Sequence, residues 1–106
     1  MKDLLRKLGA RIKEERKVRG LTQEQLAEKV EITPRYLSRL EGGQQSPSIE
    51  TLTKLAGIFE IELQELFDFH HIGTPKELRA RLSKFMNELD EQKLRLAVRL
   101  LKAVVQ

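Results

Sequence analysis

The sequence predicts an all-α protein in which five helices are followed by two C-terminal helices. Apolar residues recur at helical spacing along most of the chain, and capping residues precede several of these segments. A composition of 40% hydrophobic and 34% charged residues fits a soluble helical protein, and 106 residues leave room for one core. We therefore expect one compact domain with a C-terminal appendage.

The first predicted helix spans roughly residues 2–19. Apolar residues recur along one side of it, at Leu5, Leu8 and Ile12. Gly20 follows as a natural left-handed cap, so the helix should end there.

Two short helices joined by a tight turn come next. Residues 22–30 form the first, because Thr22 can cap it and a glutamine three residues later can reach back to the cap. Residues 33–41 form the second, since Thr33 can accept a free N–H and a proline fits the first helical position. This is the layout of a helix-turn-helix motif.

The second helix of this pair has a polar and basic outer face. Leu37 and Leu40 mark its buried side, so Arg35, Ser38 and Arg39 point away from the core. Groups at this spacing form a surface that can enter a DNA major groove. DNA binding is therefore the leading interpretation.

A polar turn over residues 42–47 leads to a fourth helix that Ser48 can cap. Its core residues should be Leu52, Leu55, Ala56 and Phe59. Residues 62–67 add a short fifth helix, and residues 68–73 form a linker.

A second strong start signal, Thr74-Pro75-Lys76-Glu77, begins a helix that runs to about Leu89. Asp90 can cap a last helix to the C-terminus. We accordingly divide the chain into a helix-turn-helix DNA-binding domain, residues 1–69, and a dimerisation or partner-binding segment, residues 74–106.

Residues 8–67 resemble the helix-turn-helix domain of phage-repressor and Cro-type (Xre) transcriptional regulators. The matching positions are Leu21-Thr22-Gln23, Ala27, Leu37, Leu40-Glu41-Gly42-Gly43, Pro47, residues 49–56, Leu63, Leu66 and Phe67. The resemblance implies a repressor-like five-helix domain that regulates transcription. Glu31 departs from the pattern, because the family often has a glycine with positive φ there. That departure costs on the order of 1 kcal/mol.

The candidate base-contacting residues lie at or near the outer face of the second motif helix: Thr33, Pro34, Arg35, Ser38 and Arg39. Arginine's planar fork fits guanine O6 and N7, although either arginine can instead hold a phosphate. By resemblance, Gln23 contacts a phosphate; otherwise it is a polar first-turn residue.

The remaining candidate phosphate contacts are Tyr36, Gln44, Gln45, Ser46 and Ser48. Tyr36 can equally be a half-buried packing residue, and part of the 44–48 group can be a solvated loop. The resemblance also pairs Arg16 with Glu41 in a structural ion pair between the first and third helices. Removing one partner of such a pair would strand a charge.

The charge pattern is consistent with a polyanionic partner. Residues 1–20, 21–74 and 75–106 carry net charges of +5, −5 and +4. This polarity would orient the domain on DNA, while solvated faces remain the simpler explanation of the charges alone.

The last predicted helix is more apolar than one intramolecular contact requires. Leu94, Val98, Leu101 and Val105 recur at spacings of four, three and four residues. A symmetric homodimer on a roughly palindromic operator is the simplest explanation. Purely intramolecular packing is the alternative; a membrane-surface role lacks an aromatic anchor.

Nothing in the sequence supports an enzyme, a metal site or a cofactor. Cysteine is absent, His70 and His71 lack a second ligand at metal spacing, and no glycine-rich phosphate loop follows a strand. No apolar stretch approaches the roughly 20 residues that span a bilayer, so a cytoplasmic location is expected. The predicted function is a sequence-specific, homodimeric repressor. The alternative is an antitoxin or switch-type module that binds a protein partner through residues 74–106.

Overall fold

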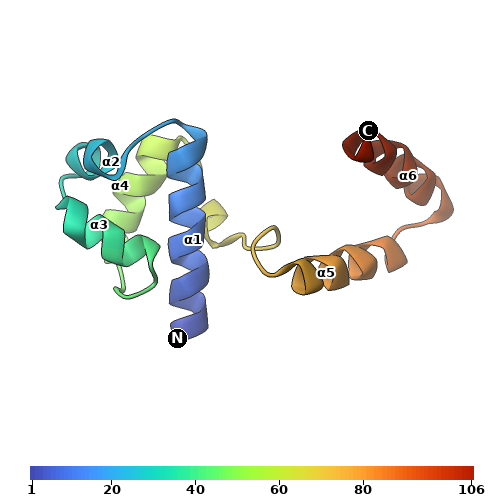
Figure 1. Ribbon diagram of the computed structural model, residues 1–106, viewed down its shortest axis with the longest axis horizontal. Coiled ribbons are helices and arrows are strands. Elements are labelled where there is room, and N and C mark those ends of the chain that lie inside the picture. Colours follow the sequence, from blue (N-terminus) through green and yellow to red (C-terminus); the bar gives the residue numbers. More distant parts are fainter. The chain divides into compact units, whose positions relative to one another are not determined.

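The computed structural model describes residues 1–106 and contains helices but no strands, which confirms the all-α prediction. The helices are α1 (Lys2–Val18), α2 (Gln23–Val30), α3 (Pro34–Glu41), α4 (Ile49–Phe59), the 3₁₀ helix η1 (Leu63–Phe67), α5 (Pro75–Asn87) and α6 (Glu91–Val105). They form two compact units, residues 1–72 and 73–106 (Figure 1). No helix combines the length and the apolar character that crossing a membrane would require.

The predicted capping residues begin the helices of the motif. Thr22 accepts a hydrogen bond from the Gln25 backbone N–H, while the Gln25 side chain accepts one from the Thr22 N–H. Thr33 accepts from the Tyr36 N–H at the start of α3, where Pro34 occupies the first turn. Each cap satisfies an N–H that the helix leaves free, and so fixes where α2 and α3 begin.

Two helix ends differ from the sequence prediction. The fifth helix begins at Leu63 rather than at residue 62, and it is a 3₁₀ helix of five residues, longer than most helices of this type. The sixth predicted helix, α5, ends at Asn87 instead of at Leu89. Glu88 and Leu89 donate their N–H groups to carbonyls three residues back, which tightens the last turn.

Two turns contain a left-handed glutamate. Glu31 ends α2 with φ 61°, as its place in the motif suggested, and Glu60 ends α4 with φ 57°, which was not predicted. Each donates its N–H to a carbonyl of the preceding helix, so the helix end is capped without glycine.

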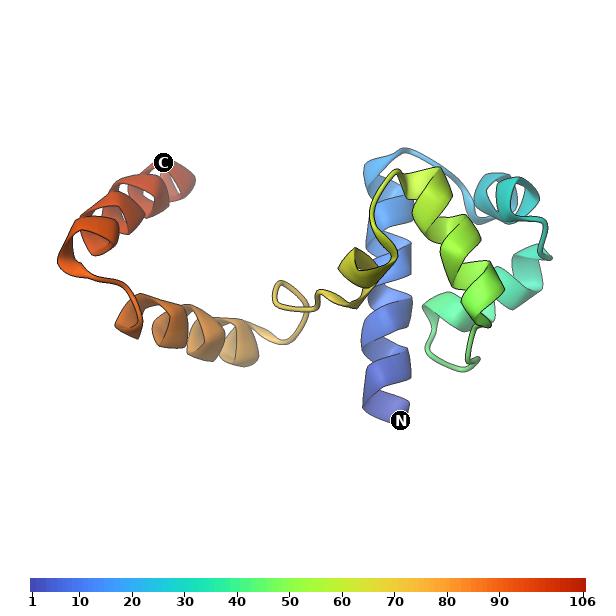
Figure 2. The same cartoon turned by 180° about the vertical axis from the view of Figure 1, so that it is seen from behind.

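The core of the first unit draws on all five of its helices. The buried side chains are Leu8, Ile12, Leu26, Ala27, Val30, Leu37, Leu40, Leu52, Leu55, Ala56, Phe59 and Leu66. α1 lies between α3 and η1 in both views (Figures 1 and 2). Because α2 and α3 both pack into this core, their outward side chains are held on a rigid support.

Gly9 lets α1 approach the end of α3 at backbone distance. A Cβ atom built on Gly9 would lie 2.3 Å from the Leu40 carbonyl oxygen and 2.7 Å from that of Glu41. Backbone atoms of a packed helix cannot move aside as a flexible side chain can. Only glycine fits at this crossing.

Replacing Gly9 with alanine should therefore lower the free energy of unfolding by about 1 to 3 kcal/mol, because the two helices must separate. Denaturant titration of the full chain measures the change. Gly57→Ala is the matched control: Gly57 is also helical, but nothing lies within 4 Å of its added Cβ. It should stabilise the protein by up to about 1 kcal/mol through helix propensity. Equal stability of the two variants would contradict the proposed crowding at Gly9.

The second unit has no buried core of its own. Neither α5 nor α6 contains a buried residue. Its most exposed large apolar side chains lie on α6, where Val104 is 80% and Val105 85% exposed. This apolar surface is either covered by a partner or remains exposed to solvent, which is energetically unfavourable.

Candidate nucleic-acid interface

The exposed face of α3 carries the predicted base-contacting residues. Leu37 and Leu40 are buried, and the opposite side is exposed at Thr33, Pro34, Arg35, Ser38 and Arg39. The period of the helix produces this separation, since residues three and four apart share a face. The structure thus gathers all five candidates on one short helix and its cap.

The guanidinium groups of Arg35 and Arg39 have no partner within the protein, whereas the four other arginines of the first unit are all hydrogen bonded. Both lie on an exposed face, four residues apart. A free guanidinium keeps all five N–H donors available for a bidentate acceptor such as guanine or phosphate.

The polar neighbours of these arginines are partly used within the domain. Thr33 Oγ1 accepts the Tyr36 N–H at 3.1 Å, so its hydroxyl retains one donor for a ligand. Tyr36 is half-buried and packs against the core. Ser38 is exposed between the two arginines.

A buried ion pair fixes the end of α3 against α1. Arg16 Nε lies 2.7 Å from Glu41 Oε2, and its second terminal nitrogen lies 3.1 Å from Oε1. The side chains are only 9% and 3% exposed. Arg16 also donates to the Leu21 carbonyl at 2.8 Å. This fork-on-fork geometry sets both the distance and the rotation between the two helices.

Gln23 joins the same network. Its Nε2 donates to Glu41 Oε1 at 3.0 Å, and the side chain is partly buried. One N–H of the amide is therefore occupied, and the other remains for an external acceptor. Glu41 serves as the common acceptor for the α1 arginine and for the residue at the start of α2.

The loop after α3 brings the other candidate phosphate contacts to the surface. Gln44, Ser46 and Ser48 are exposed, and Gln45 is half-buried. Ser48 caps α4 by accepting the Thr51 N–H at 3.1 Å and donates to Thr51 Oγ1 at 3.0 Å. The Ser48 hydroxyl therefore uses its donor within the protein. The free backbone N–H groups in the first turn of α4 are better placed than this hydroxyl to donate to a phosphate.

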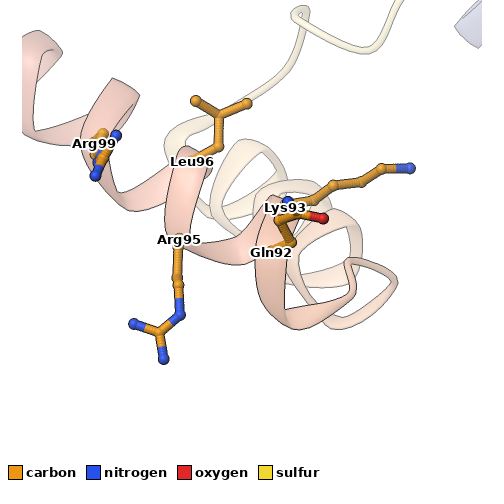
Figure 3. A pocket seen from close by; sticks show the side chains of 5 residues that line it. All are labelled: Gln92, Lys93, Arg95, Leu96 and Arg99. Carbon is orange, nitrogen blue, oxygen red and sulfur yellow. The ribbon is translucent and has the colours of Figure 1, made fainter.

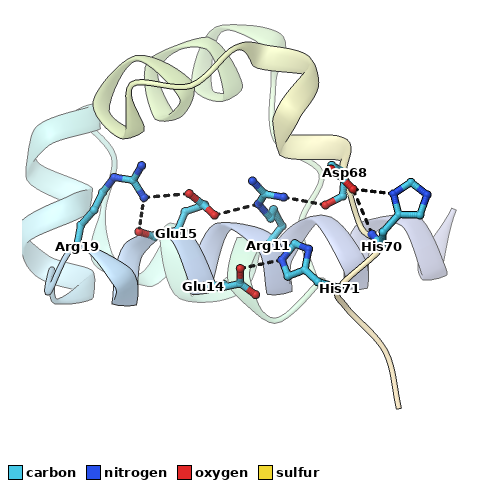
Figure 4. Close-up of polar contacts among 7 residues, drawn as sticks. All are labelled: Arg11, Glu14, Glu15, Arg19, Asp68, His70 and His71. Carbon is cyan, nitrogen blue, oxygen red and sulfur yellow. Dashed lines mark hydrogen bonds and ion pairs between the residues drawn. The ribbon is translucent and has the colours of Figure 1, made fainter. Parts of the chain in front are cut away.

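On its other side, α1 carries a ladder of ionic contacts that the sequence interpretation missed (Figure 4). Glu15 pairs with Arg11 at 3.1 Å and with Arg19 at 2.9 Å. Arg11 donates to the Asp68 carbonyl, and Arg19 donates to the Phe59 carbonyl while stacking on the Phe59 ring. The signal was present in the sequence as charges four residues apart.

The two histidines of the linker hydrogen bond to carboxylates. His71 Nε2 lies 2.7 Å from Glu14 Oε1, which attaches the linker to α1. His70 Nδ1 lies 2.8 Å from Asp68 Oδ1, and this hydrogen bond lowers the pKa of the Asp68 carboxyl. No group of three or more potential metal-ligating side chains occurs in the structure.

A surface depression on α6 does not have the form of a ligand site. It is lined by Gln92, Lys93, Arg95, Leu96 and Arg99. Figure 3 shows these side chains pointing away from one another along a single helix. Groups that diverge cannot enclose a small molecule, so α3 remains the candidate interface.

The predicted dimer residues lie on the uncovered surface of α6. Leu94, Val98 and Val105 are 40%, 61% and 85% exposed, and Leu101 is half-buried. A second apolar stripe, which lies outside the predicted dimer residues, runs through Leu96, Leu100 and Val104. Apolar residues therefore cover most of the helix circumference.

Known proteins with similar sequences include transcriptional regulators and repressors. A helix-turn-helix family model matches residues 12–66. SinR, an HTH-type transcriptional regulator of Bacillus subtilis, is 37% identical over 65 residues, or 60% of this chain and 59% of SinR. The cryptic phage CTXphi transcriptional repressor RstR of Vibrio cholerae is 33% identical over 86 residues, or 81% of this chain and 76% of RstR.

Solved structures of such regulators share the fold. The complex of SinR with SinI matches 90% of this chain and 94% of that chain, with a TM-score of 0.58 and 27% identity. Bacillus thuringiensis PlcR, solved with the peptide PapR7 and DNA, matches 83% of this chain and 31% of PlcR, with a TM-score of 0.58 and 32% identity. The chain spans about three fifths of the length of SinR. Since the family model covers half of the sequence and RstR is similar over most of both chains, this chain belongs to the helix-turn-helix family of phage-repressor and Xre type.

Proposed function

We propose that the protein is a sequence-specific regulator of transcription that inserts α3 into the major groove of double-stranded DNA. The observation that carries the proposal is the pair of exposed, unpartnered arginines on α3, a helix that a buried ion pair fixes in place. The guanidinium group of arginine can donate two hydrogen bonds to O6 and N7 of guanine. A rigidly supported helix holds such groups in a fixed position relative to the DNA. Relatives named as repressors support the same role.

The proposed active form is a homodimer that represses by occupying a roughly palindromic operator. Two α3 helices related by a two-fold axis would enter successive major grooves about 34 Å apart. The uncovered apolar surface of α6 favours a second copy as the partner. Because the target is DNA, we keep the cytoplasm as the proposed location.

Selection of bound sequences from a random DNA pool tests the proposal directly. We expect an enriched motif with two related halves, and steeply salt-dependent binding because several phosphates are held in each half. Recovery of no motif, together with only weak binding to any DNA, would reject the proposal.

Replacing Arg39 with alanine should weaken operator binding by about 1 to 3 kcal/mol and relax the preference at one base position in each half-site. Its side chain has no partner within the protein, so the fold should be unaffected. Repeating the selection with the variant measures both effects. Gln23→Ala is the comparison, since loss of a phosphate contact should lower affinity for all sequences alike. An unchanged motif for Arg39→Ala would remove this residue from the base contacts.

A second candidate function is that of a switch-type module that binds another protein through residues 74–106. It is favoured by the absence of buried residues in α5 and α6, and SinR was solved as a complex with SinI. DNA binding separates the two: a pure adaptor would bind DNA only weakly and without sequence preference.

A further inference from the structure

α1 has two flanks of different chemistry. On one flank, Glu15 pairs with Arg11 and Arg19, and Arg11 donates to the Asp68 carbonyl (Figure 4). Arg19 also donates to the Phe59 carbonyl. These charges hold α4, η1 and the linker to α1. These side chains already form ion pairs and hydrogen bonds within the first unit, so few of their donors and acceptors remain for an external partner.

The other flank is basic and exposed. Lys2, Arg6, Lys13 and Lys17 follow one another at spacings of four, seven and four residues, which places them along one face. All four are exposed, and the three lysines have no partner in the protein. Arg6 bonds only to Asp3, one turn earlier, at 2.9 Å.

Two close backbone contacts place this basic flank beside the end of α3. Gly9, which lies between Arg6 and Lys13 along the helix, meets the carbonyls of Leu40 and Glu41. A Cβ on Gly43, in the loop after α3, would lie 2.8 Å from the Arg6 Cα. Gly43 has φ 74° and immediately precedes Gln44, the first of the proposed phosphate contacts in that loop. The basic row of α1 therefore adjoins the loop that follows α3.

We infer that Arg6, Lys13 and Lys17 of α1 form a phosphate-binding track that extends the contact of the α3–α4 loop along the DNA backbone. The inference rests on the proposed function and adds residues to the same site. Residues 6–17 rise by about 16 Å along the helix axis, enough to reach more than one phosphate. Long lysine side chains suit this task because they hold a phosphate as point charges without fixing a base.

The double variant Lys13→Gln/Lys17→Gln tests the track through the salt dependence of DNA binding. If each lysine neutralises one phosphate, the slope of log K against log salt should fall by about 1.8. Affinity at 0.15 M salt should drop roughly thirtyfold by the same relation, for operator and unrelated DNA alike. The selected motif should not change, and the charge-preserving variant Lys13→Arg/Lys17→Arg should keep the wild-type slope.

The matched control is Lys29→Gln/Lys54→Gln, which removes the same charge from exposed lysines of α2 and α4. It should leave the slope close to that of the wild type. An α1 variant with the wild-type slope, or a control that loses as much slope as the α1 variant, would overturn the track. In both cases the wild type would still bind its operator, whereas failure of the proposed function appears as a wild type with no selected motif.

Discussion

Replacing Arg16 with alanine is expected to lower the free energy of unfolding by about 3 to 5 kcal/mol. The variant removes the cation from Glu41, whose side chain is only 3% exposed in the wild type, and it removes the donor to the Leu21 carbonyl. Stability and operator affinity should fall together, because the pair holds the end of α3 against α1. Denaturant titration and DNA binding on the same preparation measure the two effects.

Two further variants separate a buried charge from a general loss of contacts. The double change Arg16→Met/Glu41→Leu should recover much of the lost stability, because no charge is left buried. Arg95→Ala is the exposed control: Arg95 pairs with Glu91 at 2.8 Å, but both side chains are at least three-quarters exposed. That change should cost no more than about 0.5 kcal/mol. An unchanged denaturation midpoint for Arg16→Ala would show that the pair does not stabilise the fold.

Truncation after Ile72 is expected to give a folded monomer that has a much lower affinity for the operator. The first unit keeps its whole core, while the uncovered helices of the second unit are lost. Linking two DNA-binding units raises affinity by factors of roughly 10² to 10⁴ through effective concentration, and that gain should disappear. Light scattering gives the oligomeric state, and titration with the full operator gives the affinity.

The two apolar stripes of α6 allow a sharper test within the full chain. Val98 lies on the predicted dimer stripe and Leu100 on the other, and each is 61% exposed. Val98→Asp should dissociate the dimer, because a charge at a covered position is desolvated, whereas Leu100→Asp should leave it intact. A monomeric wild type, or a truncated chain that still dimerises and binds the operator equally well, would move the interface elsewhere.

Local features of the first unit could be predicted because they depend on nearby residues. Thr22, Thr33 and Ser48 each cap a helix that begins with the next residue, and the buried side of α3 follows from two leucines three apart. The resemblance drew attention to Glu31, which takes the left-handed conformation. Such features need only the helical period and the chemistry of free N–H groups.

Contacts between residues distant in sequence could not be predicted in the same way. Arg11 and His71 meet partners 57 residues away, and the hydrogen bond from Gln23 to Glu41 depends on how two helices cross. A glycine inside a long amphipathic helix, as at position 9, can indicate that another backbone packs closely against it. The sequence analysis did not draw this inference. Neither α5 nor α6 contains a buried residue, so no contact within the chain indicates what covers them.

The shared carboxylate of Glu41 has a consequence for genetics. Because this carboxylate binds Arg16 in the core, whereas the side chain of Arg39 is exposed and has no partner, a screen for loss of operator binding would recover two kinds of allele. Substitutions at Arg16 would act by unfolding the domain, so their phenotype would worsen with heat and ease in the cold. Substitutions at Arg39 would leave the protein folded and would be defective at every growth temperature. Temperature sensitivity of the phenotype would thus distinguish the residues that stabilise the domain from those proposed to contact the operator.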